Sequence, residues 1–161
     1  MAMSRMSYKK EIYEAAAKTF EITCFLFPLE EDEANNESQE QLSLSHMQSV
    51  VEFSGAIDGM VVITPSKALL SAMAGNMLGI DEPNDDEKEE ALCEVANIIS
   101  GNIAPIFSQK GDICYISPPK LFDSRKKLTK KIKDSLKETV RIFLDEGAAD
   151  IEVHYQDQEK L

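Results

Sequence analysis

The chain has 161 residues, of which 43% are hydrophobic and 29% are charged. This length and apolar content are typical of one globular domain with its own core, and they argue against wholesale disorder, so we expect residues 1–161 to form a single domain. Seventeen basic residues against 29 acidic ones give a formal net charge of -12. Because such a surface repels polyanions, nucleic acid is not expected as a partner.

Cysteine usage and hydropathy predict a cytoplasmic protein. Cys24, Cys93 and Cys114 form no short-spaced motif and have apolar neighbours, as small core residues do in a reducing compartment. The longest early apolar run covers about eight residues, 22–29, whereas a membrane-spanning helix needs roughly 20. The basic residues near the N-terminus are not followed by the apolar stretch and cleavage site of a secretory signal. We therefore expect no membrane span.

The first third of the chain contains one helix, one loop and one hairpin. A 3.6-residue period of apolar side chains predicts a helix from Tyr8 to about Thr23. The acidic, asparagine-rich segment 30–40 buries too little apolar area to order itself and is expected to be a solvated loop. Two alternating runs then flank Gly55–Gly59, which predicts an antiparallel hairpin at about 50–64. The ordered part of the domain should extend from about residue 8 to 155.

Two further helices are expected in the middle of the chain. Ser66 and Gly79 fit the start and the end of one helix. Acidic residues then open a third helix, roughly Asp85 to Gln109, where they favour the helix N-terminus. Pro105 lacks a backbone donor, which leaves open a kink or an early end between Gly101 and Pro105.

The C-terminal third is expected to complete an antiparallel sheet. A short strand should end at Pro118, and residues 138–155 alternate on both sides of a central "DEGA" turn, which indicates a second hairpin. Between them, the basic segment 124–133 is either a solvated loop or short helix, or a surface that steers an acidic partner. Helices and hairpins in this order favour an α+β fold in which two or three helices pack on one mainly antiparallel sheet.

The third helix carries a polar stripe opposite its apolar one. The core stripe of this helix is predicted to be Leu92, Val95, Ala96, Ile99, Ile103 and Ile106. Glu94, Asn97 and Gly101 are spaced three and four residues apart and share the other face. That face could simply be solvated, but an exposed helical glycine costs roughly 1 kcal/mol relative to alanine without compensation. Ile98 borders the stripe, so a contact surface for a partner is the second interpretation.

The run Glu94-Val-Ala-Asn97-Ile-Ile-Ser-Gly101-Asn102 resembles the ExxNxxxGN signature of the CheC/CheX chemotaxis phosphatases. A single copy points to the CheX branch, and the order of the predicted elements from about Tyr8 to Tyr155 also resembles CheX-like chains. Ala68, Ser71, Gly75 and Asn76 repeat the spacing without the two functional side chains. This echo is either an internal pseudo-symmetry or a chance recurrence of small residues.

The resemblance implies a phosphatase that hydrolyses the aspartyl phosphate of a CheY-type response regulator. Asn97 would orient the attacking water, Glu94 would pair with the active-site lysine of the regulator, and Ile98 and Gly101 would contact that partner. The resemblance also implies a homodimer. The Mg²⁺ would belong to the regulator, so this chain would need no cofactor or metal site of its own. His46 and His154 lie far apart at strand-like positions, where structural roles are expected.

A nucleophilic enzyme and a noncatalytic binding module are the alternatives to this interpretation. A Ser-His-Asp or Cys-His site has little support, because neither histidine has a motif and Cys93 has no evident source of a low pKa. The main alternative to a phosphatase is a noncatalytic module that binds response regulators through the same stripe. The presence of both Glu94 and Asn97 favours the phosphatase.

Overall fold

The computed structural model describes residues 7–30, 43–108, 112–126, 132 and 134–157. In chain order these ranges contain α1 (Lys9–Cys24), β1 (Met47–Ser54), β2 (Gly59–Pro65), α3 (Lys67–Leu78), α4 (Asp85–Ile103), the 3₁₀ helix η2 (Ala104–Phe107), β3 (Tyr115–Ile116), β4 (Lys120–Asp123), β5 (Ser135–Leu144) and β6 (Gly147–Gln156). Residues 31–40 of the predicted acidic loop and most of the basic segment 124–133 lie outside the described residues, so the expectations for them stay predictions.

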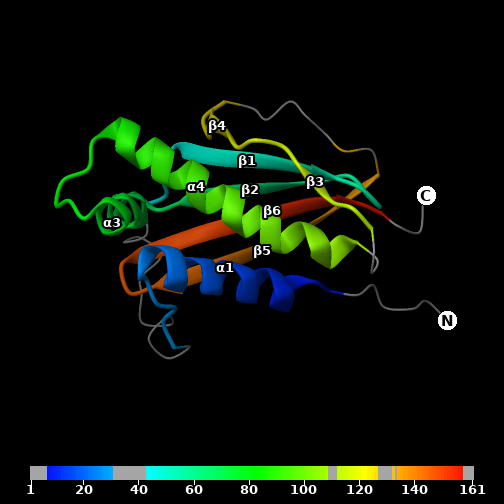
Figure 1. Cartoon of the computed structure of the whole chain (residues 1–161), viewed down its shortest axis with the longest axis horizontal. Coiled ribbons are helices and arrows are strands. Elements are labelled where there is room, and N and C mark those ends of the chain that lie inside the picture. Colours follow the sequence, from blue (N-terminus) through cyan, green and yellow to red (C-terminus); the bar gives the residue numbers. More distant parts are fainter. Residues whose placement is uncertain (1–6, 31–42, 109–111, 127–131, 133, 158–161) are drawn as a thin grey trace.

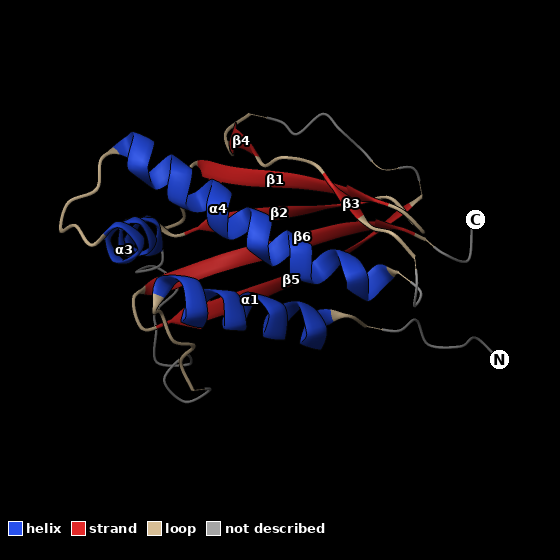
Figure 2. Ribbon diagram, in the orientation of Figure 1, coloured by secondary structure: helices blue, strands red, loops and turns tan. Residues whose placement is uncertain are grey.

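All pairings of the six strands are antiparallel. The strand order is β3-β1-β2-β6-β5, and β4 pairs with β1 beside β3. Both predicted hairpins are present, as β1–β2 and β5–β6. The helices cover one face of the sheet, with α4 and α1 lying along it and α3 at one end (Figure 1, Figure 2). The predicted α+β fold is therefore confirmed.

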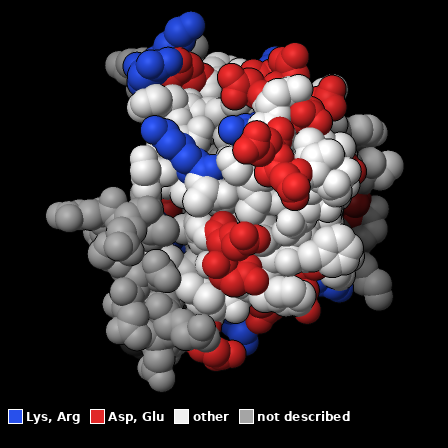
Figure 3. Space-filling model, turned by 90° about the vertical axis from the view of Figure 1, so that its left-hand side faces the viewer, with Lys and Arg blue, Asp and Glu red and all other residues white. Residues whose placement is uncertain are grey.

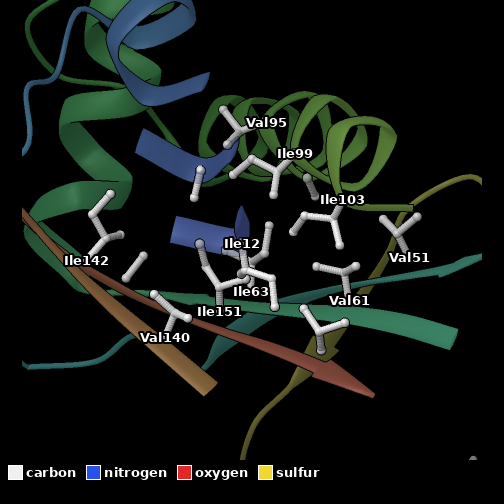
Figure 4. Close-up of a cluster of buried hydrophobic side chains, with 14 of the residues drawn as sticks. Ile12, Val51, Val61, Ile63, Val95, Ile99, Ile103, Val140, Ile142 and Ile151 are labelled. Carbon is white, nitrogen blue, oxygen red and sulfur yellow. The ribbon is translucent and has the colours of Figure 1, made fainter. Parts of the chain in front are cut away.

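The main core lies between the helices and this face of the sheet. Val95, Ile99 and Ile103 project from α4 toward Ile63 and Ile151 on the strands (Figure 4), and all five are 0–1% exposed. The predicted core stripe of α4 is thus buried, apart from Ile106, which follows the end of the helix and is half-buried. Because this stripe is buried, the opposite face of α4 points to the outside of the molecule.

Helix α4 begins and ends at identifiable signals. Asn84 and Glu87 form a capping box, in which the side chain of each accepts a hydrogen bond from the backbone N–H of the other. Of the two ends that the sequence left open, the early one between Gly101 and Pro105 is confirmed and the extension to Gln109 is not: α4 ends at Ile103, and residues 104–107 form a 3₁₀ turn that contains Pro105. Proline cannot donate to the helical hydrogen-bond ladder, which explains the early end.

The region after η2 differs from its prediction in one respect. The strand expected before Pro118 is present but has only two residues, β3. A second short strand, β4, follows the two prolines and pairs with the first half of β1. Four residues beside a proline pair give no periodic signal, and the pairing with β1 is long-range, so the sequence did not predict β4.

Candidate functional site

The polar stripe of α4 lies on the outside of the molecule. Glu94 and Asn97 are exposed, whereas Ile98 and Gly101 are half-buried. Neither polar side chain has a hydrogen bond or ion pair with any other described residue. The carboxylate and the amide are therefore free to bind another molecule, and the carboxylate can accept while the amide can both donate and accept.

The support beneath the stripe is rigid. Helix α4 packs against α3, α1 and the sheet, and its buried face contributes to the single large core cluster found in the described residues. The capping box at Asn84 holds the first turn. A site on a packed helix is held more accurately than a site on a loop, so the backbone positions of Glu94 and Asn97 are held about one turn apart.

Gly101 is less open than the sequence suggested. A Cβ atom built at this position would lie 3.7 Å from Cδ1 of Ile116, on β3, and would meet no other atom within 4 Å. This is an ordinary van der Waals contact, and the backbone of Gly101 has no positive φ. The fold therefore does not require glycine here, which leaves the close approach of another molecule as a reason for it.

The thiols near the site are poor nucleophiles. Burial raises the pKa of Cys93, and the Glu89 carboxylate adds to the effect. Burial, assisted by the Glu94 carboxylate, raises the pKa of Cys24 to about 12. Because the thiolate is the reactive form of cysteine, both residues stay protonated and unreactive at neutral pH. The raised pKa values of the two thiols thus argue against a covalent cysteine mechanism at this stripe.

The two histidines lie apart from the stripe. His154, on β6, has its Nε2 atom 2.6 Å from Glu152 Oε1, and His46 is exposed just before β1. Among the described residues, no three His, Cys, Asp or Glu side chains gather as a metal site would require. The part of the chain in the structure also has no helix long and apolar enough to cross a membrane.

Sequence reasoning missed an apolar neighbour of Glu94. The side chains of Phe25, after α1, and Leu78, at the end of α3, are 64% and 49% exposed and line a pocket of about 220 Å³ together with Glu94. The hydrophobic run 22–29 was the available signal. It could not be assigned to the site, because the two segments meet Glu94 only through tertiary packing.

These features define an α+β protein that presents a free carboxylate and amide on one surface helix. The family model described as "Chemotaxis phosphatase CheX" matches residues 47–143, more than half of the chain, and includes the whole stripe. The chain belongs to this family of chemotaxis phosphatases. A comparison with curated proteins found no match.

Solved structures of CheX proteins share the fold. CheX of Desulfovibrio desulfuricans is 18% identical, with a TM-score of 0.71 over 94% of this chain and 100% of that one. CheX of Vibrio vulnificus is 17% identical, with a TM-score of 0.69 over 96% and 100%. The CheX–CheY–BeF₃–Mg²⁺ complex of Borrelia burgdorferi gives 17% identity and a TM-score of 0.66 over 95% and 100%. At these identities the likeness shows the fold alone, and it is the family model that confirms the resemblance to the CheX branch.

Proposed function

We propose that this chain hydrolyses the aspartyl phosphate of a CheY-type response regulator, with Asn97 orienting the attacking water and Glu94 binding the active-site lysine of the regulator. The observation that carries the proposal is the free, exposed pair of Glu94 and Asn97 on the packed helix α4. Membership of the chemotaxis phosphatase family supports it. A CheX protein bound to CheY has been solved from Borrelia burgdorferi, which supports the kind of partner.

The chemistry asks little of the enzyme. In phosphoryl transfer the protein mainly positions the nucleophile in line with the leaving oxygen and stabilises the charge that develops. The carbonyl oxygen of Asn97 can accept a hydrogen bond from a water and hold it on that line. The Glu94 carboxylate can form a charge-assisted hydrogen bond with a lysine ammonium, which fixes α4 over the phosphorylated pocket.

The required rate acceleration is within reach of two residues. A hundredfold increase over self-hydrolysis of the regulator corresponds to roughly 2.7 kcal/mol of transition-state stabilisation. One oriented water with restricted motion can supply that amount. Under this proposal the Mg²⁺ is held by the acidic pocket of the regulator, and the chain supplies the amide and the carboxylate alone.

Glu94→Ala should raise KM for the phosphorylated regulator more than it lowers kcat. The carboxylate acts in the docked complex as well as in the transition state, so its loss appears mainly in binding. The defect should shrink at high salt, because the ion pair of the wild-type protein is then already screened. Phosphate release at several regulator and salt concentrations measures both effects.

Glu14→Ala is the matched control for Glu94→Ala. Glu14 is an exposed glutamate on α1, so this change removes the same charge from another helix. Its KM should equal that of the wild-type protein. An unchanged KM in Glu94→Ala at low salt would remove Glu94 from the proposed docking contact.

The family resemblance also leads us to expect a homodimer. Sedimentation at micromolar concentration should give about twice the chain mass of 18.0 kDa. A monomer across that concentration range would contradict this prediction.

A further inference from the structure

A small pocket adjoins the proposed site between three helices. Phe25 forms one wall, after the end of α1, and Met77 and Leu78 form another at the end of α3. Glu90 and Glu94 of α4 close the third side. We call this hollow of about 220 Å³ the Phe25 pocket. It is smaller than the roughly 300 Å³ at which small-molecule pockets begin, so its size suits one side chain of a partner protein.

The chain holds Phe25 in an unusual conformation. Phe25 has φ 56° and lies in the left-handed region, at the position after a helix where glycine is usual. The N–H of Leu26 donates to the carbonyl oxygen of Phe20 at 3.1 Å, a Schellman-type closure, and Leu26 is fully buried. This backbone conformation is unfavourable for a bulky residue. Burial of the side chain does not offset the cost, because Phe25 is 64% exposed. Such an outlier calls for a functional reason.

A second contact fixes the other wall. The side-chain amide of Asn76, on α3, donates to the carbonyl oxygen of Cys24 at 2.9 Å. This bond joins the ends of α1 and α3 and satisfies a carbonyl that the helix leaves without a partner. The walls carrying Phe25 and Leu78 are therefore positioned before any partner binds, and binding loses less conformational entropy.

The charge around the Phe25 pocket has one sign. The charged residues that line it are Glu87, Glu90 and Glu94. Glu87 is engaged in the capping box, whereas Glu90 and Glu94 have no hydrogen bond or ion pair with another described residue. Figure 3 shows carboxylates spread over this end of the molecule, with few lysine and arginine side chains among them. If a partner inserts an apolar side chain into the pocket, a cationic residue next to that side chain would be attracted by these carboxylates.

The Phe25 pocket is continuous with the proposed site. Glu94 belongs to both, and Glu90 and Asn97 are separated by only about 10 Å along the helix at 1.5 Å per residue. A protein interface of ordinary size covers about 800 Å² on each partner. A regulator seated on Asn97 would therefore cover the pocket as well.

We propose that the Phe25 pocket selects the regulator, by accepting from it an apolar side chain that stands beside a lysine or arginine. This inference rests on the proposed function, since the occupant belongs to the same docked regulator. Phe25 and Leu78 contact the apolar group, and Glu90 pairs with the neighbouring cation. Exposed apolar residues that enter a partner's pocket or receive its side chains are typical of sites that dominate binding.

Phe25→Gly tests the apolar half of the proposal. The probe is a purified CheY-type regulator, phosphorylated for turnover or loaded with BeF₃⁻ for binding. The variant should bind it about tenfold more weakly and raise KM accordingly. Its melting temperature should stay equal or rise, because glycine is favoured in the left-handed conformation. Ile113→Ser is the control: it removes a side chain of similar exposure, 66%, outside the pocket. It should change neither the affinity for the regulator nor KM. Wild-type affinity in Phe25→Gly overturns the proposal.

Glu90→Gln tests the charged half. It should weaken binding of the BeF₃⁻-loaded regulator at low salt, and the difference should vanish at high salt. A loss that does not depend on salt would overturn the assigned ion pair. The two proposals can fail separately: a wild-type chain that binds the regulator without accelerating phosphate release defeats the phosphatase, while the affinity of Phe25→Gly still decides on the pocket.

Discussion

Asn97→Ala is expected to lower kcat for the phosphorylated regulator by tenfold or more, with affinity nearly unchanged. A group that orients water acts mainly in the transition state, so its loss appears in kcat. Asn97 is exposed and has no hydrogen bond with another described residue, and alanine is the better helix former. The variant should therefore fold at least as stably as the wild-type protein.

The measurement combines phosphate release at saturating regulator with the affinity for BeF₃⁻-loaded regulator. Loss of turnover without loss of affinity assigns Asn97 to the chemical step. A raised KM with an unchanged kcat would make Asn97 a docking residue and contradict its assigned role. Thermal unfolding checks that the comparison is made between folded proteins.

Gly147→Ala is expected to lower the free energy of unfolding by about 2–6 kcal/mol. Gly147 has φ +108°, and a Cβ there would lie 2.6 Å from Ser66 Oγ and 2.7 Å from the Leu69 nitrogen. Ser66 is the N-cap of α3, and its Oγ accepts from the N–H groups of Leu69 and Ala148, each at 3.1 Å. A methyl group here adds backbone strain, about 1–3 kcal/mol, to overpacking of about the same size.

Gly79→Ala is the matched control for that change. Gly79 also has a positive φ, +68°, but a Cβ there meets nothing within 4 Å. It should cost only the conformational part, about 1–2 kcal/mol. Thermal unfolding of the two variants separates strain from crowding, at about 2–4 °C per kcal/mol for a chain of this size. Equal melting temperatures would show that the contact of Gly147 with the α3 N-cap carries no cost.

Elements with local signals were predictable from the sequence. Helix α1 lies within one residue of its prediction at each end, and α3 has Ser66 and Gly79 as its caps. These elements follow from apolar periodicity and capping chemistry, which depend on neighbouring residues. Strand β4 was missed because its position depends on pairing with β1, about 70 residues earlier in the chain.

The part of the candidate site that depends on the local helical period was predictable from the sequence. The helical period was enough to place Glu94 and Asn97 outside and Val95 and Ile99 inside. The Phe25 pocket and the contact of Gly101 with Ile116 come from packing between distant segments. No local pattern encodes such contacts.

The echo of the motif in α3 gains a partial explanation. Asn76 donates to the Cys24 carbonyl, and Gly75 accepts hydrogen bonds from the N–H groups of Gly79 and Ile80. Both residues thus make hydrogen bonds that stabilise the end of α3.

The most direct test of the proposed function is the decay of a phosphorylated CheY-type regulator with and without the wild-type chain. Labelled phosphate on the regulator is followed in time after the phosphodonor is removed. The proposal predicts a decay about a hundredfold faster in the presence of the chain, which corresponds to roughly 2.7 kcal/mol. A decay equal to self-hydrolysis, measured with regulators that bind the chain, would contradict it and would make the α4 stripe the surface of a noncatalytic binding module.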